Sequence, residues 1–377
     1  MYPPETIEVL DRHRFDIEAL GRYLRGRIAG LEPPFVVREF RGGQSNPTYY
    51  MSGADLDVSG ADLDVSGADL DVSGADLDVS GADLSGPRQF VLRRKPPGQL
   101  LPSAHAIERE YQVMTALRAT GVPVPKTYLL CDDPSVIGTP FFVMEYIAGH
   151  PMTDATLADR SPDDRRAIYR SMIEVLACLH MVDWRAVGLS NYGKPGNYIA
   201  RQLHRWTAQY RASETERIDA MERLIAWLPA HTPADDTAAI VHGDYRPGNL
   251  LLHPTQPRVT AVIDWELSTI GHPLVDLGHH ALIFRTGPED FGAFADGPTP
   301  AGIPSEADHL ETYCLITGRT SLPQWNFYVA FAMFRFAAIF QGIMGRVVAG
   351  TANDPDARNT GARAKPLAER ACALLNI

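Results

Sequence analysis

The sequence predicts an α+β fold, with a small antiparallel β-sheet in its N-terminal part and a mainly helical C-terminal part. Short strand-like segments dominate the first 150 residues, and longer segments with helical periodicity dominate the rest. A polar turn followed by two short apolar strands, residues 242–264, interrupts the helical part. The chain of 377 residues can bury a large core. We expect two lobes, 1–144 and 145–377.

Residues 5–94 contain one expected helix and three expected strands. Apolar residues recur at roughly helical spacing over 5–30, which predicts a helix. Apolar, β-branched and aromatic residues predict strands over 36–40, 48–51 and 89–94. The turn 41–46 joins the first two strands and contains a pair of glycines. Such a turn can direct backbone N–H groups towards phosphates, although an ordinary hairpin turn fits the glycines equally well.

A perfect heptad repeat, Ser-Gly-Ala-Asp-Leu-Asp-Val, occupies residues 52–84, between the second and third expected strands. Its period does not fit a pentapeptide β-helix, no Glu completes a calcium loop, and one glycine per heptad disfavours a coiled coil. Its few apolar side chains cannot offset the entropy of ordering the segment. We therefore expect a tandem duplication, or an artefact of the sequence, inserted in the turn between two strands.

Helical periodicity and capping signals predict most elements of the rest of the chain. Ser161, followed by Pro and two Asp, is a typical N-cap for a long helix. The apolar stretch 141–149 is expected to be a strand that runs into a turn. The segment 286–306 is rich in Gly, Pro and acidic residues and is expected to be a mobile loop. Helices are expected over 104–119, 162–181, 198–212 and 214–228.

The net charge of −11 is unevenly distributed along the chain. Nine of the 46 acidic residues lie in 52–86, which contains no Lys or Arg, so the remainder carries a charge of about −2. A nearly neutral remainder gives no general affinity for nucleic acid or for polycations.

Cysteine spacing and hydropathy bear on the expected environment. The cysteines are far apart and form no Cys-x-x-Cys pair, so each is expected to be a small buried side chain, which suits a reducing cytoplasm. The polar start of the chain does not resemble a signal peptide. Residues 327–344 come closest to a membrane span, but Arg335 and Gln341 interrupt them. We expect a core helix there and no membrane association.

The segment 242–252, His-Gly-Asp-Tyr-Arg-Pro-Gly-Asn-Leu-Leu-Leu, carries the clearest chemistry. Phosphoryl transfer from ATP needs a carboxylate to accept the proton of the attacking hydroxyl, and Asp244 suits this role. It also needs hard oxygen ligands for Mg²⁺, and Asn249 and Asp264 supply them. Protein kinases use the same five-residue spacing between the catalytic Asp and the Asn. An ordinary polar turn would also favour Asp, Gly, Pro and Asn, but it does not account for the second Asp at a strand end.

The string His-Gly-Asp-x-x-x-x-Asn, with Ile-Asp-Trp-Glu downstream, resembles the aminoglycoside phosphotransferase and choline-kinase superfamily. At the end of the second apolar strand the chain has Asp-Trp-Glu in place of the Asp-Phe-Gly motif of protein kinases, and it lacks their Ala-Pro-Glu motif. Residues 90–98, 105–111 and 327–342 resemble more closely the phosphotransferase domain of the acyl-CoA dehydrogenase family member 10/11 type. The resemblance implies a protein-kinase-like bilobal fold, with a nucleotide-binding N-lobe and a catalytic C-lobe.

The resemblance also implies that ATP and Mg²⁺ are the cofactors. Arg93 matches the phosphate-binding cation of the third strand, with Lys95 in reserve, and Glu110 is expected to pair with it. The stretch 141–149 resembles the hinge between kinase lobes. The residues expected to contact the nucleotide are Ser45, Asn46, Arg93, Glu110, Met144, Glu145 and Ile147.

The resemblance implies a hydroxylated acid or a hydroxyacyl-CoA as the phosphate acceptor. Arg201, His204 and Arg205 share a helix face that could bind an anionic acceptor, although a solvated face is the simpler explanation. Glu266 is a further candidate for substrate binding. An aminoglycoside or choline-type acceptor is the alternative, and a nucleotide-binding pseudokinase is the alternative of a different class.

Overall fold

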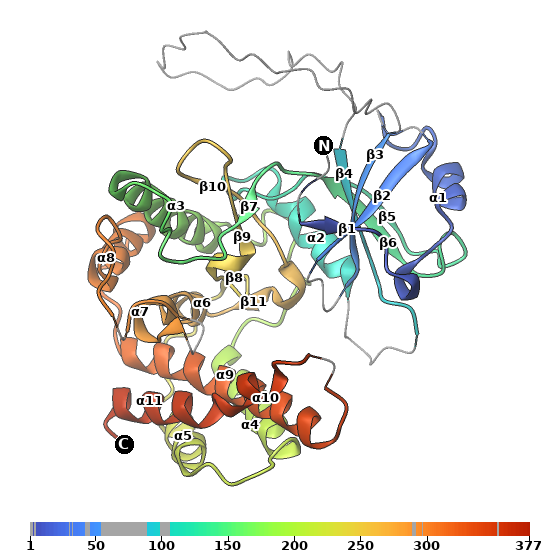
Figure 1. Ribbon diagram of the computed structural model, residues 1–377. Helices are drawn as coiled ribbons and strands as arrows, with labels where there is room; N and C mark the ends of the chain where they lie inside the picture. Colours follow the sequence, from blue (N-terminus) through green and yellow to red (C-terminus); the bar gives the residue numbers. More distant parts are fainter. Residues whose placement is uncertain are drawn as a thin grey trace, which may run out of the picture. The chain divides into compact units, whose positions relative to one another are not determined.

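The computed structural model describes residues 3, 5–29, 31, 33–41, 46–53, 89–98, 106–288, 292–295, 297–352 and 354–377. They divide into two compact units: one takes its residues from 1–111 and 127–146, and the other from 112–126 and 147–377. The first unit is built on a sheet and the second is mainly helical, which confirms the predicted α+β class (Figure 1). The heptad repeat lies outside the described residues from its third position onward.

The first unit contains a six-stranded antiparallel sheet in the order β1-β2-β3-β4-β6-β5. The four strands expected in this unit are confirmed as β2, β3, β4 and β6. Strand β4 pairs with both β3 and β6, which places Thr48 opposite Arg93 and Phe90 opposite Glu145. The strands are β1 (Thr6–Ile7), β2 (Phe35–Phe40), β3 (Thr48–Gly53), β4 (Gln89–Arg94), β5 (Thr127–Cys131) and β6 (Phe141–Glu145).

One face of this sheet forms the core of the unit together with helix α1 (Ile17–Leu24). Successive side chains of a strand point to opposite faces, so the core residues alternate along β3, β4 and β6. They include Tyr49, Met51, Phe90, Leu92, Phe141 and Val143, packed with Leu20 and Leu24.

The prediction of a helix over residues 5–30 is wrong for much of this stretch. Only α1 is an α-helix, while β1 is an edge strand and a 3₁₀ turn, η1 (Asp11–His13), follows it. The Leu10 N–H donates to Glu39 Oε2 at 3.0 Å. This contact with β2 and the pairing of β1 show that tertiary partners outweigh the helical periodicity of the sequence here.

The second unit contains most of the helices and two small sheets. The helices expected at 162–181 and 198–212 are confirmed, whereas the one expected from 214 begins at Asp219. The helix expected at 104–119 is α2 (Ile107–Leu117), which begins in the first unit. The other helices are α3 (Pro162–Met181), α4 (Tyr198–Ala212), α5 (Asp219–Ala230), α6 (Pro273–His280), α7 (Leu282–Arg285), α8 (Glu306–Thr317), α9 (Trp325–Val348), α10 (Ala357–Ala362) and α11 (Ala364–Leu375).

Two short sheets of this unit carry the polar turn 242–249. One sheet has the order β10-β9-β7, and the other pairs β11 with β8. The two apolar strands expected after the turn are confirmed as the antiparallel pair β9 and β10. The strands are β7 (His150–Pro151), β8 (Ala239–Val241), β9 (Leu250–Leu252), β10 (Val259–Val262) and β11 (Thr269–Gly271).

Helix α9 lies at the centre of the helical unit. Helices α4, α6, α10 and α11 all pack against it (Figure 1). By length and composition α9 could cross a membrane, but most of it is buried inside the unit. Its burial agrees with the expected core helix, and the described residues contain no other helix that passes the same test.

Candidate active site

The polar turn begins directly after β8 and is held by a buried carboxylate of α6. The backbone N–H groups of His242 and Gly243 donate to the two oxygens of Asp276, at 2.6 and 2.8 Å. His180 Nε2 lies 3.5 Å from the same carboxylate. Burial raises the pKa of Asp276, but the nearby imidazole of His180 and the hydrogen bond from the Gly243 N–H lower it below its usual range. The turn is therefore fixed by charge-assisted hydrogen bonds.

The turn requires glycine at position 243. Its φ of +82° lies in the left-handed region, and a Cβ there would approach the carbonyl oxygen of Leu267 to 2.6 Å. Only glycine satisfies both conditions without moving the backbone. The close approach holds the turn against the segment that follows Asp264.

His242 connects the turn to the end of β10. Its Nδ1 accepts a hydrogen bond from the Asp244 N–H at 3.2 Å, and its Nε2 donates to the carbonyl oxygen of Ile263 at 3.0 Å. These two bonds require the tautomer with the proton on Nε2. The imidazole therefore links the backbones that carry Asp244 and Asp264, and the contacts give it a positioning role.

Asp244 is surrounded by donors. Asn249 Nδ2 donates to its Oδ2 at 2.8 Å, Arg246 Nε to the same oxygen at 3.1 Å, and His279 Nε2 lies 3.1 Å from Oδ1. The side chain retains 19% of its exposure. Burial raises the pKa of Asp244, but the hydrogen bond from His279 and the positive charges of Arg246 and Arg335 outweigh burial and hold it below its usual range. Asp244 is a carboxylate at neutral pH.

His279 contributes to this site mainly as a neutral donor. Burial lowers the pKa of His279 more than the neighbouring Asp244 raises it, so the imidazole is neutral at neutral pH. Its hydrogen bond to Asp244 then requires the proton on Nε2. This contact was not predicted from the sequence. A usable signal was the three-residue spacing of Asp276 and His279, which puts both on one face of α6.

The two expected metal ligands are joined through their backbones. The Ile263 N–H donates to the Asn249 carbonyl oxygen at 3.0 Å, which ties the residue before Asp264 to Asn249. Asp264 follows β10 with a left-handed φ of 67°. Asn249 uses its Nδ2 on Asp244, and the described residues place no donor on its Oδ1. An amide oxygen and a carboxylate are ligands that Mg²⁺ accepts, with phosphate oxygens and water completing the set.

In the first unit, Arg93 pairs with Glu110 as the resemblance implies. Arg93 Nε lies 2.9 Å from Glu110 Oε2 and 3.1 Å from Oε1, and Asn46 Nδ2 donates to Oε1 at 3.1 Å. Glu110 and Asn46 are buried. Lys95 instead pairs with Glu108, so the reserve cation is engaged with a different acid. Ser45 lies outside the described residues.

The expected hinge residues lie at the end of β6. Met144 and Glu145 pair with Val91 and Phe90 of β4 and are half-buried. Ile147, also half-buried, is the first residue of this stretch that belongs to the helical unit. That the nucleotide base lies against these backbone groups stays a prediction from the resemblance.

The three candidate substrate residues occupy different settings. Arg201 donates to the backbone carbonyl oxygens of Lys194 and Gly196, so its guanidinium is used to hold the loop before α4. Arg205 is exposed, with its Cζ 5.2 Å from the ring centre of Trp206. Glu266 is half-buried on the 3₁₀ turn η3 (Trp265–Leu267).

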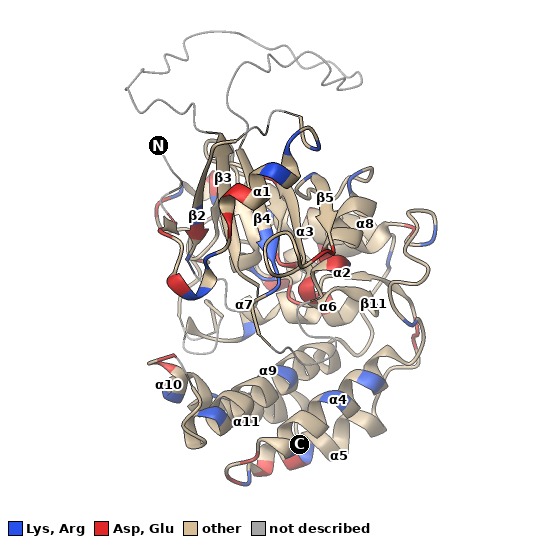
Figure 2. Cartoon of the chain, turned by 90° about the vertical axis from the view of Figure 1, so that its right-hand side faces the viewer, with Lys and Arg blue, Asp and Glu red and all other residues tan. Residues whose placement is uncertain are grey.

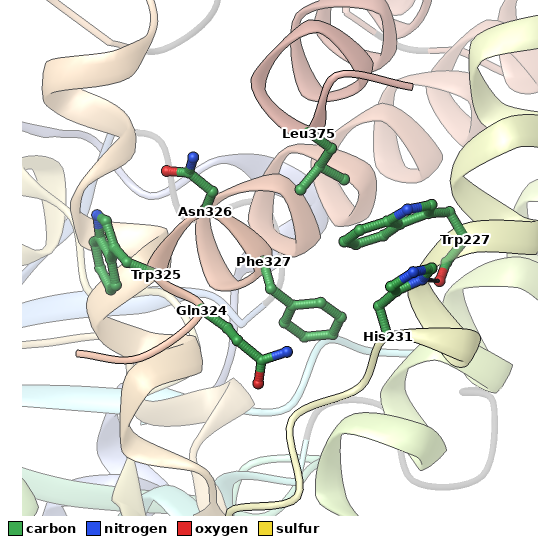
Figure 3. A pocket seen from close by; sticks show the side chains of 7 residues that line it. All are labelled: Trp227, His231, Gln324, Trp325, Asn326, Phe327 and Leu375. Carbon is green, nitrogen blue, oxygen red and sulfur yellow. Dashed lines mark hydrogen bonds between the residues drawn. The ribbon is translucent and has the colours of Figure 1, made fainter.

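A pocket of about 410 Å³ lies elsewhere in the helical unit (Figure 3). Trp227 and His231 of α5 and its C-terminus stack with ring centres 3.9 Å apart, beside Phe327 and Leu375. None of the lining residues is acidic, and none belongs to the constellation around Asp244. Among the described residues, no group of three or more His, Cys, Asp or Glu could hold a metal ion by itself. A site with one carboxylate and one amide would not form such a group.

Comparison with known proteins agrees with this geometry. The model of the phosphotransferase enzyme family matches residues 71–309. Mouse (Mus musculus) acyl-CoA dehydrogenase family member 10 is 42% identical over 373 residues, which are 98% of this chain and 32% of the mouse protein. The chain therefore spans about a third of that relative.

Solved structures give the fold. A Ralstonia eutropha protein, assigned provisionally to the aminoglycoside phosphotransferases, is 44% identical with a TM-score of 0.81, and the match covers 96% of this chain and 99% of that one. A spectinomycin phosphotransferase solved with ADP and spectinomycin matches with a TM-score of 0.58 at 10% identity, over 97% and 99% of the two chains. The latter match supports the fold alone. The kinase-like fold implied by the sequence is thus confirmed, and the chain belongs to the phosphotransferase enzyme family.

Proposed function

We propose that this protein is an ATP- and Mg²⁺-dependent small-molecule kinase that phosphorylates a substrate hydroxyl. The observation that carries the proposal is the constellation of Asp244, Asn249 and the segment of Asp264. Asp244 is ionised and hydrogen-bonded to Asn249, and Asn249 is tied to the residue before Asp264. This arrangement offers one carboxylate for the acceptor hydroxyl and separate oxygens for a metal.

In this proposal Asp244 accepts a hydrogen bond from the acceptor hydroxyl. It takes the proton of this hydroxyl as the hydroxyl oxygen bonds to the γ-phosphorus and the bond from that phosphorus to ADP breaks. Its lowered pKa makes it a weak base, so its first contribution is orientation of the hydroxyl, with proton transfer late in the reaction. The donors around it, Asn249, Arg246 and His279, keep the carboxylate fixed. Mg²⁺, when bound through Asn249 and Asp264, would neutralise charge on the transferred phosphate.

The nucleotide assignment rests on the first unit. Arg93, oriented by Glu110, is the cation proposed for the α- and β-phosphates, and Asn46 extends the same hydrogen-bonded group. Met144, Glu145 and Ile147 are proposed to line the adenine site. ATP as the donor rests on the resemblance of these residues and of the Asp244 segment to those of kinases.

We propose a hydroxy acid or a hydroxyacyl-CoA as the acceptor. The nearly neutral charge outside the repeat gives no reason to expect a polycationic ligand such as an aminoglycoside. The names of the mouse relative and of the Ralstonia structure point to different chemistries, acyl-CoA and aminoglycoside. A choline-type acceptor and a pseudokinase without turnover are the remaining alternatives.

The proposed division of roles is tested by calorimetry with Mg-ATP on two variants. Asp264→Asn should weaken Mg-ATP binding, because it removes a metal ligand. Asp244→Asn should leave this binding intact but reduce turnover by at least about 10²-fold, the lower range for loss of a positioned base. Equal loss of binding in both variants would refute the role assignment.

The acceptor is tested by a phosphate-transfer screen with 3-hydroxybutyrate, 3-hydroxybutyryl-CoA, choline and kanamycin. We expect phosphate transfer to 3-hydroxybutyrate or to 3-hydroxybutyryl-CoA, and none to kanamycin. Robust phosphorylation of kanamycin would contradict the proposed acceptor class. Mg-ATP binding without turnover on any hydroxyl compound would favour the pseudokinase.

A further inference from the structure

Two buried polar residues, Arg335 and Gln341, interrupt the apolar face of helix α9, and their surroundings differ. Gln341 donates to the Ser213 carbonyl oxygen at 2.9 Å and to Thr215 Oγ1 at 2.8 Å, so its burial is compensated. Arg335 is only 8% exposed, and nothing in the described part of the chain accepts a hydrogen bond from its guanidinium or forms an ion pair with it. A buried guanidinium without an acceptor is costly, which is unusual in a helix otherwise built for packing.

Arg335 lies between helices α4 and α6. Its Cζ is 5.3 Å from the ring centre of Trp206 on α4. The next residue, Phe336, packs on the ring of His279 of α6 with centres 5.1 Å apart, and His279 in turn contacts Asp244. The helices approach closely here because Gly278 leaves room for the backbone of Tyr328, whose carbonyl oxygen would lie 2.7 Å from a Cβ. Arg335 is thereby brought to the side of the helical unit that carries Asp244.

The described groups near Arg335 offer its guanidinium no carboxylate partner. Its charge lowers the pKa values of Asp244 and His279, so both are within electrostatic range, but no carboxylate oxygen approaches its nitrogens within ion-pair distance among the described residues. Tyr198, at the start of α4, also senses this charge, and its hydroxyl finds no hydrogen-bond partner in the described chain. Burial raises the pKa of Tyr198 to about 12, so its hydroxyl remains a donor.

We propose that Arg335 binds an anionic group of the phosphate acceptor, next to the Asp244 carboxylate that orients the acceptor hydroxyl. This inference rests on the proposed function and deepens it. A guanidinium presents several donors to a carboxylate or phosphate oxygen. An anionic acceptor would therefore supply the hydrogen-bond acceptors that the described residues do not offer to Arg335. Trp206 supports one face of the guanidinium, and the Tyr198 hydroxyl is a second donor for the same anion.

This assignment moves the anion site from the surface of α4 to the buried face of α9. From the sequence, the anionic acceptor was expected at Arg201 and Arg205. Arg201 is committed to two backbone carbonyl oxygens, and Arg205 is exposed, where water weakens an ion pair. Figure 2 shows the basic bands on α4 and on α9 within the helical unit.

The anion could be the carboxylate of a free hydroxy acid or a phosphate of CoA. The test therefore measures binding of 3-hydroxybutyrate and of 3-hydroxybutyryl-CoA by calorimetry, without nucleotide, to the full chain and to Arg335→Met. Methionine has a similar length and no charge. Loss of a charged hydrogen bond predicts affinity reduced about tenfold to hundredfold for whichever compound carries the recognised anion. KM for ATP should not change.

Arg346→Gln is the matched control, because Arg346 is an exposed arginine on the last turn of the same helix. It should bind both compounds like the wild type. The melting temperature separates a binding role from a structural one: removing an uncompensated buried charge should leave Arg335→Met as stable as the wild type or more so. A destabilised Arg335→Met would instead indicate that Arg335 serves the fold.

Unchanged affinity of Arg335→Met for both compounds would overturn the inference, as would a wild type that binds neither. A wild type that binds one of them through Arg335 but transfers no phosphate would refute the proposed function and leave the anion site standing. Methylguanidinium should restore binding to Arg335→Ala if the missing group is the guanidinium itself.

Discussion

The carboxylate of Asp276 should contribute a large part of the stability of the helical unit, because it is buried and accepts two hydrogen bonds from backbone N–H groups. Asp276→Asn keeps the size of the side chain but leaves one acceptor oxygen and turns an NH₂ group towards backbone donors. The His242 and Gly243 N–H groups, at 2.6 and 2.8 Å, would lose a charged acceptor. At roughly 1.5–3 kcal/mol for each hydrogen bond to a charged group, the expected loss is about 3–6 kcal/mol of unfolding free energy.

Urea denaturation of wild type and Asp276→Asn measures this loss. Asp163→Asn is a suitable control, because Asp163 is almost fully exposed and its ion pair with Arg166 lies at the surface. Hydrogen exchange adds a local measurement: the amides of His242 and Gly243 should exchange faster in Asp276→Asn. Turnover should fall as well, since the turn that carries Asp244 loses its anchor. The reasoning fails if stability changes by less than about 1 kcal/mol, or if it drops while both amides keep their protection.

Three further outcomes are expected. Gly243→Ala should destabilise the protein and lower turnover, since its Cβ would collide with the Leu267 carbonyl oxygen, and thermal melting alongside a Gly138→Ala control tests this. Burial lowers the pKa of His280 to about 4. Between about pH 6.5 and 4 the unfolded chain therefore binds a proton at His280 that the folded chain does not bind, and the unfolding free energy should fall by about 3 kcal/mol across this range. A His280→Leu, His309→Leu variant should show a flatter pH profile in urea titrations, and an identical slope would refute the assignment. Excision of residues 53–80, four whole heptads, should leave Mg-ATP affinity unchanged, and lost binding would mean that the repeat belongs to the fold.

The sequence by itself determined the elements whose signals are local. The Ser161 cap fixed the start of α3, and the apolar run before Asp264 gave the β9–β10 pair, because caps and short hairpins depend on neighbouring residues. Glycine in the turn and the spacing of Asp244 and Asn249 likewise pointed to the catalytic segment. The spacing was enough because the side chain of Asn249 reaches back to the Asp five residues earlier.

Only the tertiary structure decided what comes together from distant parts of the chain. Residues 5–13 are not helical, despite their periodicity, because they contact β2. His279 contacts Asp244 although a long stretch of chain separates the two residues. Arg335 appeared in the sequence merely as an interruption of an apolar run. Its significance depends on burial and on the absence of an acceptor among the described residues, and both are properties of packing between α4, α6 and α9 that no local pattern encodes.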